Sequence, residues 1–264
     1  MKVLQILPQL NIGGVERGTL DLSKALIHKG HESFVISGGG ILVDELEQLG
    51  AKHYEIPVHI KSLRTLSLAK SLSETISSID PDIVHIRSRM PAWVNYRAFK
   101  MLQKKPLLVS TFHGLYSFPI YSKVMSFVDH SIAISKTVER YILENYKLDK
   151  NDITVIPRGC DPVEFNNDEI NPDDKAEIIN EFPQIVGKTV LTIPGRITKW
   201  KGVAEFIELL SLLDDNYHGL IVGPTAKSKK KYLNKLQNKV SSLDLENKIT
   251  FTGSRRDIAN IYKI

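Results

Sequence analysis

The sequence predicts an α/β fold of two doubly wound parallel sheets, the first complete and the second unfinished. Short runs rich in Val and Ile alternate along the 264 residues with longer stretches of helical period, which is the pattern of βαβ units. A hydrophilic stretch rich in Asp and Asn interrupts this alternation at 161–181, after which it restarts. We therefore expect an N-terminal domain at 1–160, a linker at 161–184 and a C-terminal domain at 185–264.

The first domain has the elements of a complete doubly wound sheet. Strands are predicted at 3–7, 33–37, 53–57, 83–87, 107–111, 131–135 and 152–156. Helices are predicted near 15–29, 42–49, 65–79, 91–104 and 136–146. Such crossover helices are what parallel neighbouring strands require.

The second domain has the elements of half such a sheet. Strands are predicted at 189–193, 219–223 and 249–253, with helices at 201–213, at 227–242 and from 257. Half a parallel sheet leaves a flank and an edge strand without cover. We therefore expect the chain to stop before this domain is finished, and residues 185–264 alone to be marginally stable.

The composition is that of a globular protein of the cytoplasm. Apolar residues make up 42% and charged residues 25%, and no apolar run is long enough for a membrane-spanning helix. The single cysteine, Cys160, excludes a disulfide framework, and the amino terminus lacks a signal-peptide cleavage site. The net charge of +5 belongs to the first half, and no aromatic stacking pattern accompanies the lysines of 227–239, so nucleic-acid binding is not expected.

Gly13 and Gly14 lie between the first strand and the first helix. The free amides of a helix amino terminus favour an anion, and glycines allow a phosphate close to the backbone. A tight turn that needs a positive φ explains the same glycines, so both interpretations stay open. The spacing is not GxGxxG, and the Gly38–Gly40 run follows the second strand instead. An NAD-dependent oxidoreductase therefore remains only a distant alternative.

His113 stands at the carboxyl end of the fifth predicted strand, in the segment Thr-Phe-His-Gly. Ligands bind at this edge of open α/β sheets, so His113 is a candidate for contact with a reacting group. His85 is expected within a buried strand, and His218 on the surface or in a turn.

A glycine-flanked pair of cations, Arg196 and Lys201, follows the first strand of the second domain, in Pro-Gly-Arg-Ile-Thr-Lys-Trp-Lys-Gly. A guanidinium binds two phosphate oxygens in fork fashion, and an ammonium supplies a point charge. The segment, which begins with Pro194 and Gly195, therefore predicts a pyrophosphate site.

With these segments the chain resembles the retaining glycosyltransferases of family four, whose GT-B fold has two facing Rossmann-like domains. The resemblance covers essentially the whole chain and rests on GGVER at 13–17, STFHG at 110–114, VIPRGCD at 155–161, GRITKWKG at 195–202 and ITFTGSRRDIANIY at 249–262. One departure is Arg158, where the family usually has Asn.

The resemblance implies roles for particular residues. Gly13 and Gly14 would present amides to the donor phosphate or the acceptor, and His113 would face the transferred sugar. Arg196 and Lys201, beside Gly195, would hold the diphosphate and stabilise the charge that builds on it, without a metal or a cofactor. The backbone of the loop that contains Gly253, Ser254 and Arg255 would meet the nucleobase.

The function implied is transfer of a hexose from a UDP- or GDP-sugar to a glycan or lipid-linked acceptor with retention, as in cell-envelope polysaccharide synthesis. The family's Glu-x₇-Glu segment, which contacts the donor sugar, would lie beyond Ile264. We therefore expect this truncated chain alone to be inactive or impaired. The alternative is a non-catalytic fragment that binds a ligand through its first domain.

Residues 87–105 combine six Lys and Arg residues with Trp and Tyr side chains. One interpretation is an ordinary amphipathic helix that covers the sheet. The other is peripheral contact with anionic lipid on the inner face of the cytoplasmic membrane, which would suit a lipid-linked acceptor.

Overall fold

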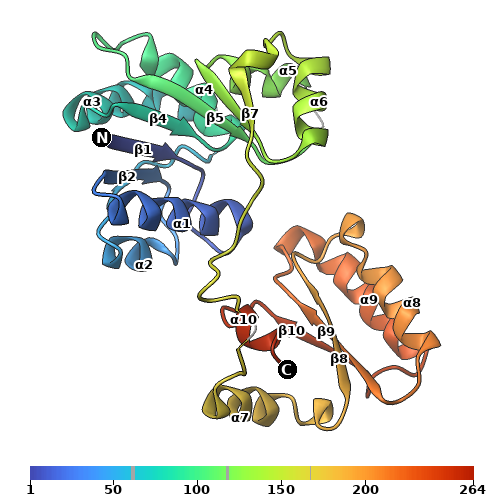
Figure 1. Ribbon diagram of the computed structural model, residues 1–264. Coiled ribbons are helices and arrows are strands. Elements are labelled where there is room, and N and C mark those ends of the chain that lie inside the picture. The colour runs from blue at the N-terminus through green and yellow to red at the C-terminus, as the bar shows by residue number, and fades with distance from the viewer. Residues whose placement is uncertain (61–62, 117–118, 167) are drawn as a thin grey trace. The chain divides into compact units, whose positions relative to one another are not determined.

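The computed structural model describes residues 1–60, 63–116, 119–166 and 168–264. The chain forms two compact units, Met1–Gly159 and Cys160–Ile264, each an α/β structure built on a parallel sheet (Figure 1). The predicted fold class is confirmed, and the predicted first domain ends one residue beyond the first unit. Within the described ranges, no helix is both long and apolar enough to cross a bilayer.

The first unit contains a seven-stranded parallel sheet in the order β3-β2-β1-β4-β5-β6-β7. Its strands are β1 (Lys2–Ile6), β2 (Glu32–Ser37), β3 (Lys52–Glu55), β4 (Ile83–Ile86), β5 (Leu107–Phe112), β6 (His130–Ala133) and β7 (Ile153–Val155). All seven predicted strands are confirmed. The strand order reverses between β1 and β4, which lie side by side with Val3 opposite Ile83. Such a reversal opens a crevice at the carboxyl ends of the strands.

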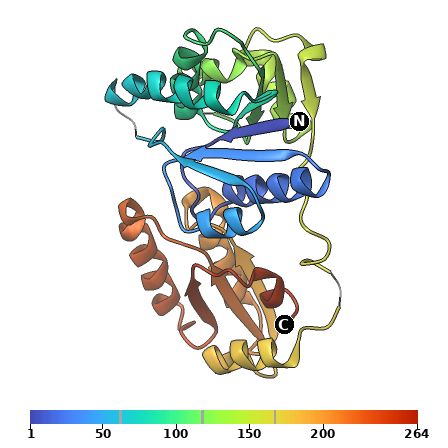
Figure 2. The ribbon, with the colours of Figure 1, turned by 90° about the vertical axis from the view of Figure 1, so that its left-hand side faces the viewer.

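Helices cover both faces of this sheet, as Figure 2 shows. The α-helices are α1 (Gly14–His28), α2 (Val43–Gln48), α3 (Ala69–Ile79), α4 (Arg89–Phe99), α5 (Pro119–Ser122) and α6 (Lys136–Asn145). The 3-10 helices are η1 (Leu63–Leu68), η2 (Lys123–Ser126) and η3 (Lys150–Asp152). Leu20 of α1 and Leu46 of α2 are buried on one face, whereas Leu72 of α3 and Val94 of α4 are buried on the other.

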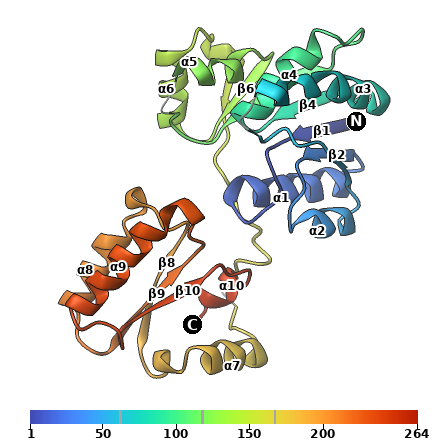
Figure 3. The same cartoon turned by 180° about the vertical axis from the view of Figure 1, so that it is seen from behind.

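The second unit contains a three-stranded parallel sheet in the order β10-β9-β8. Its elements are α7 (Pro172–Glu181), η4 (Pro183–Ile185), β8 (Thr189–Pro194), η5 (Lys199–Lys201), α8 (Val203–Leu212), β9 (Tyr217–Val222), η6 (Lys227–Lys229), α9 (Lys230–Ser242), β10 (Ile249–Gly253) and α10 (Ile258–Ile261). Helices α8 and α9 cover one face around Ile221, and α7 and α10 cover the other around Leu220 and Val222 (Figure 3). Much of the cover on the second face comes from α7, which precedes residues 185–264, so the marginal stability of that segment alone stays a prediction.

The predicted linker, 161–184, contains helix α7 instead of an unstructured connection. Its Asn, Pro and Asp residues are helix-start signals: the side chain of Asn171 accepts a hydrogen bond from the amide of Asp173 at 2.8 Å, and Pro172 takes the first helical position. Ile178 and Phe182 are then buried in the second unit. The composition that predicted a linker is that of a capped helix whose apolar residues are few but correctly spaced.

Candidate functional site

Four segments bring polar groups to the carboxyl edge of the seven-stranded sheet. Gly13 and Gly14 follow β1, Arg87 follows β4, His113 follows β5 and Arg158 follows β7. The sequence predicted the two glycines and His113 at this edge, but it did not predict the two arginines. The side chains of Arg158 and His113 meet, with Nη2 of the guanidinium 3.4 Å from Nδ1 of the imidazole.

The two glycines of the first loop leave room for neighbouring side chains. Neither has the positive φ that would require glycine. Gly13 has a φ of 175°, an extended value that any residue adopts, and Gly14 is not among the residues with positive φ. The tight-turn interpretation is therefore wrong for both. A Cβ atom on Gly14 would strike Nη1 of Arg158, and one on Gly13 would strike the carboxylate of Glu16. The bare backbone lets these charged groups lie directly against the start of α1.

The Gly38–Gly40 run supports this loop from β2. The amide of Leu10 donates to the carbonyl of Gly39 at 2.8 Å, and the amide of Leu42 donates to the carbonyl of Leu10 at 2.9 Å. Gly40 has a φ of 143°, and a Cβ atom there would overlap the backbone of Leu10. The run is thus a packing feature that fixes the loop.

Arg87 is a buried cation. Only 6% of the residue is exposed, and its Nη1 donates to Oε1 of Gln5 at 2.8 Å. Gln5 is itself held by Ser23, whose Oγ accepts from Nε2 at 3.0 Å. Burial first, and then the cation of Arg158, lower the pKa of Arg87 to about 10, so it keeps its charge at neutral pH.

His113 is a neutral imidazole. Burial, followed by the charges of Arg87 and Arg158, lowers its pKa to about 2. Because Arg158 can only donate, Nδ1 accepts and the proton of the ring lies on Nε2. This Nε2 is buried and has no hydrogen-bond partner among the described residues. His113 therefore offers an unused donor at the edge of the sheet.

The predicted cation pair in the second unit lies where β8 ends. Arg196 and Lys201 are both exposed, and Nζ of Lys201 lies 4.7 Å from the centroid of the Trp200 ring. The stem of Lys201 runs past Gly195, since a Cβ atom there would be 3.6 Å from its Cε. Gly202, with a φ of 75°, is the N-cap of α8. The loop thus holds both cations between a strand end and a helix amino terminus.

Three glycines line the ends of the three strands beside these cations. Gly195, Gly223 and Gly253 have φ values of 143°, 150° and 72°. The amide of Gly195 donates to the carbonyl of Val222 at 2.8 Å, and that of Gly223 donates to the carbonyl of Gly253 at 2.7 Å. A Cβ atom on Gly223 would overlap the carbonyl of Gly195. These close approaches leave backbone at the strand ends without side-chain cover.

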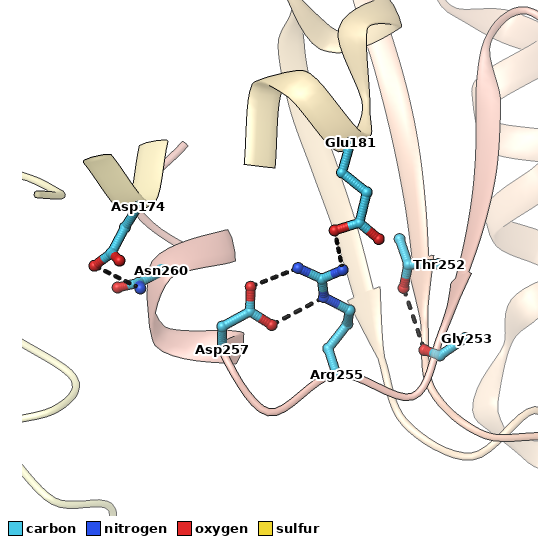
Figure 4. A network of polar contacts seen from close by, with 7 residues as sticks. All are labelled: Asp174, Glu181, Thr252, Gly253, Arg255, Asp257 and Asn260. Carbon is cyan, nitrogen blue, oxygen red and sulfur yellow. Dashed lines mark hydrogen bonds and ion pairs between the residues drawn. The ribbon is translucent and has the colours of Figure 1, made fainter. Parts of the chain in front are cut away.

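The loop after β10 is pinned by Arg255 (Figure 4). Its Nε and Nη2 donate to the two carboxylate oxygens of Asp257 at 2.9 and 2.6 Å, and its Nη1 pairs with Glu181 of α7. The guanidinium also lies 5.4 Å from the centroid of the Phe182 ring. The side chain of Arg255 is thus engaged within the unit, whereas Gly253 and Ser254 are exposed.

The structure gathers the predicted residues into two groups, one in each unit. Gly13, Gly14 and His113 share an edge with Arg87 and Arg158, and Gly195, Arg196 and Lys201 lie at the end of β8, in the same sheet as Gly253. Among the residues that the structure describes, no three His, Cys, Asp or Glu side chains could together hold a metal ion.

Comparisons with known families match both units. The family description Glycosyltransferase Family 4 matches residues 12–164, and Glycosyl transferases group 1 matches residues 174–264. An uncharacterised glycosyltransferase of Methanocaldococcus jannaschii is 32% identical over 148 residues, which are 49% of this chain and 36% of that protein. The matched stretch is therefore little more than a third of that curated relative.

Solved structures share the arrangement of elements. A glycosyltransferase from Rickettsia africae is 34% identical, with a TM-score of 0.83 and coverage of 100% of this chain and 70% of that chain. Anabaena HepE in complex with UDP-glucose is 20% identical, with a TM-score of 0.83 and coverage of 99% and 71%. These matches do not favour an oxidoreductase or a non-catalytic module. The chain has the GT-B fold and belongs to Glycosyltransferase Family 4.

Proposed function

We propose that the protein carrying this chain transfers a hexose from a UDP- or GDP-sugar to a glycan or lipid-linked acceptor, in the synthesis of cell-envelope polysaccharide. The observation that carries this proposal is the pair Arg196 and Lys201 at the glycine-lined end of β8. Membership of the family supports glycosyl transfer, and the UDP-glucose bound to the HepE structure supports a nucleotide-sugar donor.

In the proposed reaction the bond between the anomeric carbon and the diphosphate of the donor breaks, and its electron pair stays with the diphosphate. A hydroxyl oxygen of the acceptor bonds to the anomeric carbon, and its proton passes to the leaving diphosphate. Arg196 binds two of the diphosphate oxygens and Lys201 adds a point charge, so both stabilise the leaving group more strongly as its charge grows. The stem of Lys201 passes Gly195, and its ammonium lies 4.7 Å from the centroid of the Trp200 ring. We propose that these cations act without a metal ion or another cofactor.

We propose that His113 contacts the transferred sugar by donating from Nε2 to a hydroxyl oxygen. The support is the buried donor without a described partner and the low pKa that keeps the ring neutral. A neutral imidazole accepts from Arg158 at Nδ1 and can still donate from Nε2 to a hydroxyl oxygen.

We propose that the backbone at Gly253 and Ser254 meets the nucleobase. Arg255 supports this role indirectly, because its bonds to Asp257 and Glu181 fix the loop. The two preceding residues are exposed and leave their peptide groups accessible. Retention of the sugar's configuration is part of the same proposal.

Release of nucleoside diphosphate tests this function. The protein that carries the chain is incubated with UDP-glucose or GDP-mannose and candidate acceptors, and Lys201→Ala is compared with Lys199→Ala, which removes a neighbouring exposed ammonium. We expect at least a hundredfold loss for Lys201→Ala alone, since about 3 kcal/mol of charge stabilisation disappears. Equal rates for both variants would overturn the proposal. NMR of the anomeric proton in the product reports retention or inversion.

We also propose that the protein works in the cytoplasm, in peripheral contact with the inner face of the membrane. Helix α4 covers the sheet with Ala92, Val94 and Ala98, so the ordinary amphipathic interpretation is confirmed. Arg97 of α4 and Lys100, which caps the helix, are exposed cations that support contact with anionic lipid.

A further inference from the structure

Two guanidinium groups lie against one bare stretch of α1. A Cβ atom on Gly18 would be 3.2 Å from Nη2 of Arg87 and 3.6 Å from Nη2 of Arg158. Gly14, one helical turn earlier, contacts Nη1 of Arg158. The residues come from the ends of β4 and β7, so the tertiary fold, and not sequence proximity, brings these two cations together.

This cation pair is not neutralised by an ion pair within the described part of the chain. Among the described residues no carboxylate lies at ion-pairing distance from either guanidinium, and Glu16 and Asp21 offset only part of the positive charge from farther away. Burial and the charge of Arg158 both act against the charged form of Arg87. A protein that holds two cations together at such a cost has a site suited to an anion.

Two buried donors, one on Arg87 and one on the neighbouring His113, have no acceptor among the described residues. They are Nε of the guanidinium and Nε2 of the imidazole. Helix α1 has 15 residues, and its first amide with a helical acceptor is that of Arg17, which donates to the carbonyl of Gly13. The amides before it, beginning with Gly14, are available to a ligand. Guanidinium forks and free amides together match the several oxygens of a phosphate group.

We propose that Arg87, Arg158 and the first turn of α1 form a binding site for a phosphate group of the acceptor. The proposal rests on the proposed function, in which the diphosphate of the donor is held by Arg196 and Lys201 in the second unit. The acceptor is therefore a phosphate-bearing molecule, such as a sugar linked to a lipid through phosphate. Arg158 is a departure from the usual family motif, and this site gives it a function.

Glu16 is the internal competitor at this site. Its carboxylate lies against Gly13, at the helix amino terminus where an anion is favoured. A bound phosphate displaces this carboxylate or is repelled by it. Removing the charge with Glu16→Gln therefore strengthens phosphate binding, whereas removing a guanidinium weakens it.

Titration of the full chain with inorganic phosphate tests the site, with the amide NMR signals of Gly14 and Gly18 as reporters. We expect these signals to shift, and we expect the affinity measured from them to fall roughly tenfold or more in Arg158→Gln. Arg158 is exposed, so this variant keeps the fold even if Arg87→Gln does not. The control Arg140→Gln removes an exposed guanidinium of α6 and leaves the affinity unchanged. No shift at Gly14 in the wild-type chain, or equal effects of the two variants, would overturn the proposal.

The same titration with saturating UDP separates the acceptor's phosphate from the donor's. If the site takes the acceptor's phosphate, the affinity read at Gly14 does not change with UDP present, and Arg158→Gln leaves UDP binding intact. Displacement of phosphate by UDP would assign the site to the donor and overturn the proposal. If neither UDP nor GDP binds while phosphate still shifts Gly14, the proposed donor specificity fails and the anion site stands.

Discussion

The side chain of Arg87 leaves little room for any residue larger than glycine at position 18. A Cβ atom there would lie 3.2 Å from Nη2 of the buried guanidinium, closer than side chains ordinarily approach. Glycine inside an exposed helix costs about 1 kcal/mol relative to alanine. The close contact accounts for glycine in the fifth position of α1, and it links the helix to the cations that the sheet edge supplies.

The variant Gly18→Ala separates helix stability from phosphate binding. Alanine restores up to about 1 kcal/mol of helix propensity, and the crowding of Arg87 offsets part of it. We expect the free energy of unfolding in urea to change by less than about 1 kcal/mol, while phosphate affinity read at Gly14 falls several-fold. An affinity equal to that of the wild type would show that the guanidinium of Arg87 is not part of the site.

Acid destabilises the first unit through its buried histidines. Burial, followed by the charge of Arg87, lowers the pKa of His85 to about 3, so between that pH and about 6.5 only the unfolded chain takes up its proton. The free energy of unfolding is therefore unaffected by His85 well above pH 6.5, and it decreases as the pH falls from 6.5 towards 3. One such histidine lowers the free energy of unfolding by about 2 kcal/mol between pH 7 and pH 5.

The measurement is urea unfolding at both pH values, in a Trp200→Phe background so that Trp93 reports on the first unit alone. We expect the loss of stability between pH 7 and pH 5 to be about 2 kcal/mol smaller in His85→Gln than in its parent. The exposed His28→Gln variant is the matched control. An equal response of both variants would contradict the burial argument.

Arg255 ties α7 to the loop after β10, so its loss loosens the second unit. Arg255→Met leaves Asp257 and Glu181 without their partner, which costs about 1 kcal/mol because both carboxylates are partly exposed to water. Hydrogen exchange followed by mass spectrometry is the measurement, with faster exchange expected in α7 and β10. Arg256→Met, which removes the neighbouring exposed arginine, is the control. Similar exchange rates in both variants would show that the contacts of Arg255 with Asp257 and Glu181 do not stabilise the second unit.

Contact of α4 with anionic lipid is tested with vesicles. The full chain is expected to sediment with phosphatidylglycerol vesicles and not with phosphatidylcholine vesicles, and to be released by high salt. Arg97→Gln and Lys100→Gln each weaken binding about fivefold, from about 1 kcal/mol per charge. Lys235→Gln, on α9, serves as the control. Binding to neutral lipid, or a similar loss in the control, would contradict the contact.

The strands of both sheets were predictable because each is a short run of apolar and β-branched residues between polar turns. Helix α7 was not, because its cap and first turn, from Asn171 to Asp174, have the composition of a linker. His218 was expected at the surface but is 1% exposed in β9, where its Nε2 lies 2.9 Å from Oγ1 of Thr250. A polar residue inside a strand is identified as buried only once its partner on the neighbouring strand is known.

The candidate sites were predictable to different degrees. Arg196 and Lys201 stand five residues apart, so the sequence alone places them in one loop. Arg87 and Arg158 are far apart in the sequence, and the residues around each of them indicate only an ordinary surface cation. Their meeting at Gly14 and Gly18 depends on the strand order that sets β1 beside β4, and on the path of the chain after the edge strand β7, which carries Arg158. A site formed by residues of one loop could thus be predicted from the sequence. A site formed by residues far apart in the chain could be found only in the folded structure.

Calorimetric titration of the chain with UDP and with GDP tests the account most directly. We predict that one of the two binds, and that Arg196→Gln and Lys201→Gln each weaken it at least tenfold, since each removes a charge-assisted bond worth about 1.5–3 kcal/mol. Lys199→Gln, in the same loop, should leave the affinity unchanged. Binding of neither nucleotide, or equal weakening by all three variants, would contradict a diphosphate site at Arg196 and Lys201.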